Sequence, residues 1–159
     1  MVRFSFRSAS VALFLLCGVL FSALAVAARA ELATRALTVE MASGKTHAFT
    51  VEVARTAQER ERGLMERDTL DPDAGMLFDF GAPRLVTMWM HDTPKPLDML
   101  FADKTGRITR IAAMTTPFSE DLISSGGDVL YVVEIRGGRA KELGIKVGDR
   151  LGGAALQHP

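Results

Sequence analysis

The pattern of apolar and polar residues predicts a series of short strands. Residues 37–41 and 47–54 alternate apolar with polar positions, which predicts two strands joined at a Ser43-Gly44 turn. Further strands are expected at residues 76–80, 86–90, 97–101, 107–114 and 129–135, where apolar residues recur between turn residues, and residues 144–151 predict a last turn and strand. Residues 91–96 contain two prolines and predict a rigid connection, and residues 115–128 predict a loop.

Two short helices are expected among these strands. Thr56 and Glu59 have the spacing of a capping box, which predicts a helix over residues 57–62 ending at Gly63. Gly137-Gly138 opens a second helix that ends near Leu143. Many short strands with two short helices predict an α+β, predominantly β, domain. We expect a strongly curved sheet or partly closed barrel that the helices cover.

The first thirty residues have the pattern of a secretory signal peptide. Arg3 and Arg7 precede an uncharged apolar run, residues 11–28, and small residues follow at Ala28-Arg29-Ala30 or Ala25-Val26-Ala27. The alternative is that this segment stays uncleaved and anchors the protein in a membrane. We expect no other contact with a membrane. We therefore predict an exported protein, periplasmic or secreted. The expected parts are a signal peptide at 1–30, a flexible lead at 31–36, one domain at 37–152 and a tail at 153–159.

Composition excludes several classes of function. Basic and acidic residues both number 19, and the chain lacks the positive field that binds nucleic acid, so we expect no nucleic-acid partner. Its one cysteine, Cys17, lies inside the predicted signal peptide. The mature chain then has no thiol nucleophile, disulfide or cysteine-bound metal, and we expect no cofactor. The sequence also lacks a Walker, His-Glu-x-x-His or EF-hand motif.

Several sequence blocks resemble the DUF192 family, also called UPF0127. The blocks follow the family order and are Gly63-Leu64-Met65, residues 75–78, residues 89–93, residues 96–101, residues 131–134, Gly137-Gly138 and Gly148-Asp149. The chain differs from the usual family pattern at Met88, His91 and Asp92. The resemblance implies a small β-rich domain, often behind a signal peptide or membrane anchor in bacteria and archaea. It implies no established biochemical activity.

Four residues form the candidate ligand site. Trp89 is the single tryptophan and stands beside the proline-stiffened connection that contains Thr93. Asp98 and Glu134 each interrupt an apolar strand, where a carboxylate needs a partner. We expect a module that binds a small molecule or glycan near these residues. The alternative for Asp98 is a structural role, in which its carboxylate caps the nearby corner of the chain.

Two other classes of function stay open. Asp98 and Glu134 could serve as paired carboxylates in a cofactor-independent enzyme if their strands are neighbours. The chain could instead be a purely structural interaction module. Copper is a weaker hypothesis: methionines 76, 88, 90 and 99 lie near His91 in the sequence, but strand alternation separates Met88 from His91. We predict weak copper binding and no metal site.

Overall fold

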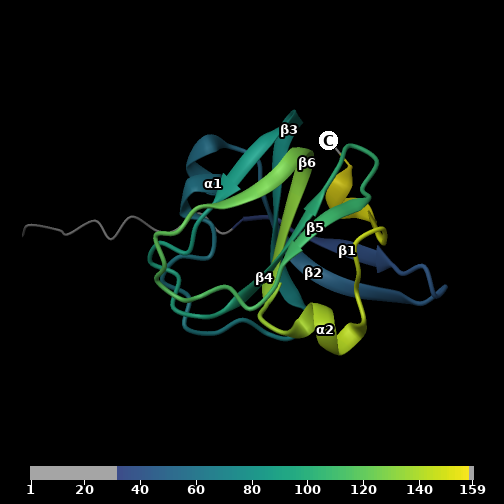
Figure 1. The fold of residues 1–159 in the computed structure, drawn as a ribbon, viewed down its shortest axis with the longest axis horizontal. Coiled ribbons are helices and arrows are strands. Elements are labelled where there is room, and N and C mark those ends of the chain that lie inside the picture. The colour runs from purple at the N-terminus through teal and green to yellow at the C-terminus, as the bar shows by residue number, and fades with distance from the viewer. Residues whose placement is uncertain (1–31, 158–159) are drawn as a thin grey trace, which may run out of the picture. The chain divides into compact units, whose positions relative to one another are not determined.

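The fold is built on one seven-stranded sheet (Figure 1). A computed structural model describes residues 32–157. The strands lie in the order β5-β4-β6-β3-β2-β1-β7 across the sheet. The elements along the chain are β1 (Thr34–Glu40), β2 (Thr46–Ala54), α1 (Ala57–Arg62), β3 (Ala74–Met88), β4 (Leu97–Ala102), β5 (Ile108–Ala112), β6 (Ile123–Arg136), α2 (Arg139–Leu143), β7 (Arg150–Gly152) and the 3-10 helix η1 (Ala154–Leu156).

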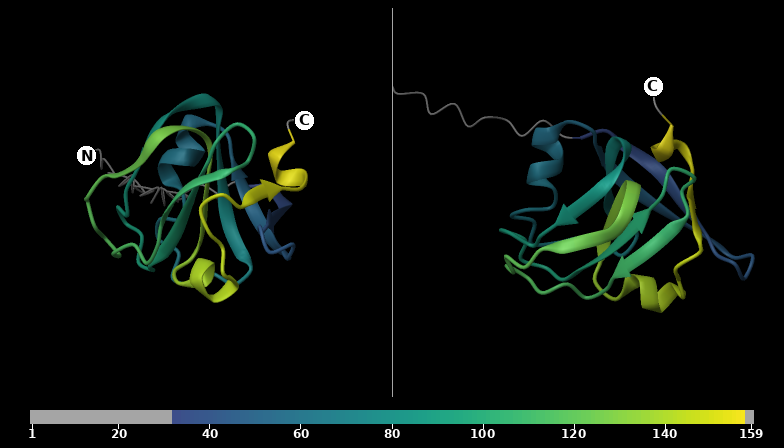
Figure 2. Two further views of the ribbon diagram at one scale, coloured as in Figure 1. Left: turned by 45° about the vertical axis from the view of Figure 1, so that its right-hand side comes forward. Right: turned by 45° about the horizontal axis from the view of Figure 1, so that its top comes forward.

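The sheet curls into a half-barrel, as expected from the sequence (Figure 2). The two edge strands of the sheet, β5 and β7, approach each other. The amide of Ile108 donates to the Asp149 carbonyl at 2.8 Å, and the amide of Leu151 donates to the Gly106 carbonyl at 2.7 Å. These bonds satisfy backbone groups that an open sheet edge would leave unpaired.

Both faces of the sheet are buried, and each has its own hydrophobic core. Leu77, Leu100 and Val133 belong to one core, which also contains Ala140 of α2. Their sequence neighbours Met76, Met99 and Val132 belong to the other core, together with Leu64 from the segment after α1. We call these the α2-side core and the α1-side core. Because side chains alternate along a strand, one-residue steps on β3, β4 and β6 move between the two cores.

The parallel pairing of β2 with β3 places α1 over the α1-side core. All other strand pairs are antiparallel, and a parallel pair needs a crossover connection. That connection contains α1 and the segment from Gly63 to Asp73. A Cβ atom added to Gly63 would lie 3.2 Å from the Phe78 ring, which shows how closely the connection approaches the α1-side core.

The capping box of α1 forms as predicted. The Thr56 hydroxyl accepts from the Glu59 amide at 3.1 Å, and the Glu59 carboxylate accepts from the Thr56 amide at 2.8 Å. None of the helix residues is buried, which agrees with a solvated charged face.

Two strand boundaries differ from the sequence prediction. The runs 76–80 and 86–90 were expected as separate strands, but β3 is continuous because a register shift against β6, between Asp79 and Arg84, absorbs the irregular residues. β6 begins at Ile123 instead of residue 129. Ile123 pairs with Met88, so residues 123–128 of the expected loop 115–128 belong to the sheet.

The described ends of the domain are also more ordered than predicted. Thr34 pairs with Glu52, so residues 34–36 are part of β1 and not a flexible lead. In the predicted tail, Ala155 is fully buried in the α2-side core. The predicted signal peptide lies outside the described residues. Within residues 32–157, no helix has the length and hydropathy needed to cross a membrane.

Candidate functional site

Three of the four predicted site residues line one cavity on the α1 side of the sheet. Trp89 follows the end of β3, Thr93 lies in the connection before β4, and Glu134 lies on β6. The cavity is small, with a volume of about 20 Å³ that holds about one water-sized group, and it opens to solvent. Its lining comprises Arg60, Glu61, Arg62, Gly63, Leu64, Met65, Phe78, Met88, Trp89, His91, Thr93 and Glu134.

Glu134 is the most unusual group in this cavity. The strand register places it between Met76 on β3 and Met99 on β4, and it is only 4% exposed. Among the described residues, its carboxyl group has no hydrogen bond or ion pair. Burial raises the pKa of Glu134 to about 8, because an ionised carboxylate is poorly solvated there. At pH 7 the neutral acid therefore predominates and has one O–H donor and a free acceptor.

Trp89 and His91 form the outer wall of the cavity. The Trp89 side chain is 40% exposed, and its ring stacks on the His91 ring with 4.7 Å between centroids and 21° between planes. His91 Nδ1 lies 2.6 Å from the Glu120 carboxylate, and Nε2 lies 3.3 Å from the Asp92 carboxylate. The hydrogen bond with Glu120 raises the pKa of His91, and the negative charge of Asp92 adds to this effect.

Thr93 holds the connection between β3 and β4 in place. Its hydroxyl donates to the His91 carbonyl at 3.0 Å, and its amide donates to the Met90 carbonyl at 3.1 Å. Its own carbonyl accepts from the Phe118 amide at 3.1 Å. Thr93 is buried, yet it lines both the Glu134 cavity and the next cavity along the connection.

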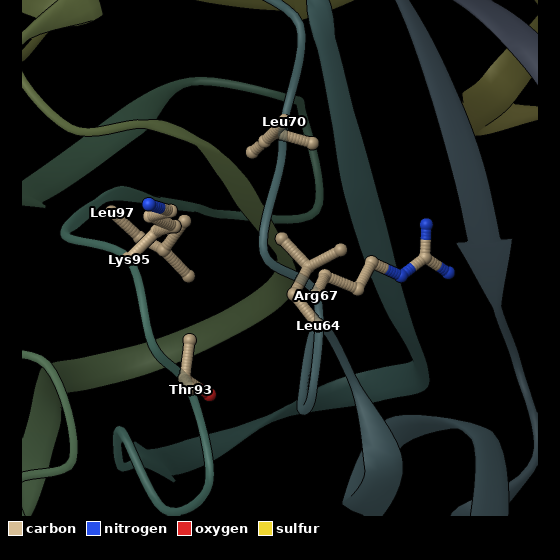
Figure 3. Close-up of a pocket in the computed structure, with 6 residues that line it drawn as sticks. All are labelled: Leu64, Arg67, Leu70, Thr93, Lys95 and Leu97. Atoms are coloured by element: carbon tan, nitrogen blue, oxygen red, sulfur yellow. The ribbon is translucent and has the colours of Figure 1, made fainter.

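Two more cavities continue from the first. The second, of about 10 Å³, has Leu64 and Leu70 on one wall and Thr93, Lys95 and Leu97 on the other (Figure 3). The Arg67 side chain points away from Lys95 and pairs with Glu52 on β2. The third cavity, of about 370 Å³, is lined by Asp68, Thr69, Leu70, Lys95, Pro96, Arg136 and Gly137.

Shared residues connect the three cavities. Leu64 and Thr93 line the first and second, and Leu70 and Lys95 line the second and third. The cavities therefore adjoin one another between residues 60–70 and residues 91–97, and we call this depression the furrow. The Glu66 amide donates to the Asp92 carbonyl at 2.8 Å and ties the two walls together.

Asp98 does not belong to the predicted ligand site. It is fully buried on the α2 side of the sheet, where its carboxylate accepts from the amides of Met114 at 2.8 Å, Gly138 at 2.9 Å and Ala140 at 2.8 Å. Asp98 thus caps the start of α2 and not the corner at Thr93. The sequence shows a carboxylate in an apolar strand, but only the strand register reveals which face it occupies.

The register also separates Asp98 from Glu134. Asp98 lies opposite Ile135, and Met99 lies opposite Glu134. The two carboxyl groups are on neighbouring strands but on opposite faces of the sheet. They cannot act together on one substrate, so the paired-carboxylate arrangement is not formed.

Some cavity residues escaped the sequence prediction. Lys95 and Arg136 were not singled out, because the pairing of Leu97 with Arg136 joins segments distant in the chain. Leu64 and Met65 lie in the family-like block Gly63-Leu64-Met65, and this block was the one sequence signal that could have pointed to them. Met88 and His91 line the same cavity despite the expected alternation, because β3 ends at Met88. Within the described residues, no group of three or more His, Cys, Asp or Glu side chains forms a metal cluster.

The fold and the cavities define a β-rich half-barrel protein with a furrow on one face. The family model DUF192 (Uncharacterized ACR, COG1430) matches residues 38–153, and the chain belongs to this family. No curated protein gives a significant match.

Two crystal structures resemble the chain. A protein from Sinorhizobium meliloti 1021, described as a putative transcription regulator, is 47% identical with a TM-score of 0.77, and the match covers 79% of this chain and 97% of that one. A protein of unknown function from Novosphingobium aromaticivorans is 40% identical with a TM-score of 0.74, and the match covers 76% of this chain and 86% of that one.

Proposed function

We propose that the domain is an exported binding module whose Glu134 cavity accepts a neutral hydroxyl or amide group of a small molecule or glycan. The single observation that carries this proposal is the buried carboxyl group of Glu134, which faces a cavity without a partner among the described residues. A polar side chain at a small cavity is poorly solvated, and a ligand group that pairs with it there forms a hydrogen bond sheltered from bulk water.

The chemistry of the cavity favours a neutral ligand group. A protonated carboxyl group both donates and accepts, as alcohols and amides do, so the two can exchange paired hydrogen bonds. The raised pKa of Glu134 supports this choice, because the carboxyl group is mostly uncharged at pH 7.

The size of the cavity and the position of Trp89 favour partial burial of the ligand. The cavity has room for about one water-sized group, so one polar end of the ligand enters while the rest stays outside. Trp89 provides an exposed aromatic surface at the entrance. Aromatic rings beside polar groups suit sugars, which combine apolar C–H faces with hydroxyl groups.

A pair of substitutions at Glu134 tests this function. N-acetylglucosamine offers both hydroxyl and amide groups, and calorimetry together with Trp89 fluorescence can follow its binding. Glu134→Gln keeps a donor and an acceptor and should retain affinity, whereas Glu134→Leu removes both and should weaken binding about tenfold. Glu40→Gln, at an exposed position on β1, is the matched control. Unchanged binding in folded Glu134→Leu would contradict the proposal and favour a purely structural module.

Export is tested separately. The positively charged start, the apolar run and Ala28-Arg29-Ala30 support cleavage before Glu31. Intact mass of the protein from the periplasm or medium should match a chain that starts near residue 31. A membrane-bound species that keeps residues 1–30 would identify an anchor instead.

A further inference from the structure

We infer that the third cavity of the furrow is a separate binding site for a small zwitterion, a molecule that carries both an ammonium group and a carboxylate, as free amino acids and short peptides do. In this site the ammonium group pairs with Asp68 and the carboxylate pairs with Lys95. The second cavity holds only about 10 Å³ and leaves no passage from this site to Glu134. The inference therefore does not depend on the proposed function.

The third cavity is large enough for a whole small molecule. Its volume of about 370 Å³ lies near the lower end of the range for small-molecule sites, whereas the first cavity has about 20 Å³. Its walls come from three segments, residues 68–70 after α1, residues 95–96 before β4 and residues 136–137 at the end of β6. Leu70 and Pro96 provide apolar surface, so the cavity also accommodates a hydrocarbon side chain of the ligand.

The wall that carries Lys95 is held in place before any ligand binds. Pro94 and Pro96 flank Lys95 and restrict the backbone on both sides of it. The Gly137 amide donates to the Pro96 carbonyl at 2.9 Å, and a Cβ atom added to Gly137 would lie 2.7 Å from the same oxygen. The end of β6 thus packs directly against this wall, and a rigid wall lowers the entropy lost on binding.

Two unpaired charges of opposite sign line this cavity. Lys95 and Leu70 lie on facing walls (Figure 3), and Asp68 stands two residues before Leu70 in the chain. The side chains of Asp68 and Lys95 are exposed and make no ion pair or hydrogen bond, with each other or with any other residue of 32–157. The cavity therefore offers a carboxylate on one wall and an ammonium group on the other.

The balance of charge favours a ligand with both signs over an anion or a cation. Arg136 also lines the cavity, but Glu142 neutralises its guanidinium through bonds of 2.7 and 2.9 Å. The unpaired charges of Asp68 and Lys95 then cancel, so the lining has no net charge. A simple anion at Lys95 is repelled by Asp68, and a simple cation at Asp68 is repelled by Lys95, whereas a zwitterion pairs with both.

Leucine and leucylleucine, each with two blocked derivatives, test this pairing. The N-acetyl derivative keeps the carboxylate without the ammonium group, and the C-terminal amide keeps the ammonium group without the carboxylate. In NMR titrations, at least one zwitterion should bind about fivefold more tightly than both of its blocked derivatives, as expected for exposed ion pairs of about 1 kcal/mol each. The zwitterion with this advantage distinguishes a free amino acid from a peptide as the preferred ligand. The amide signals of Leu70 and Gly137 should shift during the titration.

Two variants assign the two ends of the ligand. Lys95→Gln should remove the advantage over the amide derivative and keep the advantage over the N-acetyl derivative. Asp68→Asn should do the reverse. Lys104→Gln and Asp121→Asn, at exposed positions outside the cavity, should change neither.

Three outcomes would overturn the inference. They are equal affinities of the zwitterions and their blocked derivatives, an advantage that survives the matching variant, and amide shifts confined to the Glu134 cavity. Sugar binding at Glu134 would stand or fall separately, because the two sites use different residues and different ligands.

Discussion

Asp98 and Glu134 sit one register position apart on adjacent strands, and the sheet lies between their side chains. Asp98 is surrounded by three backbone amide donors, whereas Glu134 has none. The two carboxyl groups therefore face opposite electrostatic environments. Asp98 is suited to hold a charge that stabilises the fold, and Glu134 is suited to remain neutral beside a cavity.

Asp98→Asn should destabilise the fold by about 2–4 kcal/mol. The charge is lost, and a single amide oxygen cannot accept from all three backbone donors that the carboxylate satisfies. Urea unfolding measures the change. Asp121→Asn, at an exposed position, should stay within about 0.5 kcal/mol of wild type. Equal stability of the two variants would show that the contacts of Asp98 are dispensable.

The buried acid should make stability fall as pH rises. Since the pKa of Glu134 is raised from 4.5 to about 8, the folded state holds a proton that the unfolded state has lost between these values. This stabilisation, measured relative to high pH, is fully present below pH 4.5 and is lost as the pH rises through 8. Its size is about 1.4 kcal/mol for each unit by which the pKa is raised.

Other titrating groups also contribute to the pH dependence of stability. A comparison of wild type with Glu134→Gln isolates the contribution of Glu134, because those groups remain in both proteins. The raised pKa of His91 acts in the same direction, so the informative quantity is the difference in unfolding free energy between wild type and variant. That difference should change steadily from pH 5 to pH 8. A flat difference would show that Glu134 ionises at an ordinary pKa.

Trp89 should report the protonation of His91. The rings are stacked, and a protonated imidazole quenches a neighbouring indole, so emission should increase as pH rises through the raised pKa of His91. Glu120→Gln removes the main cause of the raised pKa and should move the transition to lower pH. His91→Gln should abolish it. A transition that persists without His91 would have to arise from another group.

Gly75→Ala should destabilise the sheet at the site. An added Cβ atom would lie 2.4 Å from the Glu134 carbonyl oxygen, so β3 and β6 would have to separate. We expect a loss of about 1–3 kcal/mol. Gly127→Ala is the control, since its added Cβ atom would meet nothing within 4 Å. Thermal unfolding of both variants distinguishes local overpacking from a general effect of replacing glycine.

Local signals predicted the parts of the fold that depend on neighbouring residues. The capping box at Thr56 and Glu59 fixes the start of α1 through contacts only three residues apart. Strand alternation likewise indicated where Phe49 and Val51 would be buried. The continuity of β3 was missed because its irregular middle is accommodated by β6, a partner about fifty residues later in the chain.

The candidate site was predicted only in part for the same reason. Trp89 and Thr93 are close in sequence, and their shared cavity needed little long-range information. Placing Glu134 with them, and Asp98 away from them, requires the register of β4 against β6. A shift of one residue in that register would place both carboxyl groups on the same face of the sheet, and sequence alone does not fix it.

The contact between β5 and β7 has a consequence for folding. Arg107 pairs with Arg150, and β7 also pairs with β1, so the last strand connects regions from both ends of the domain. Such contacts join residues far apart in the sequence and slow the search for the folded state. During synthesis, the half-barrel cannot complete these contacts until residues 150–152 have left the ribosome. The sheet is therefore expected to close only after its last strand has been made.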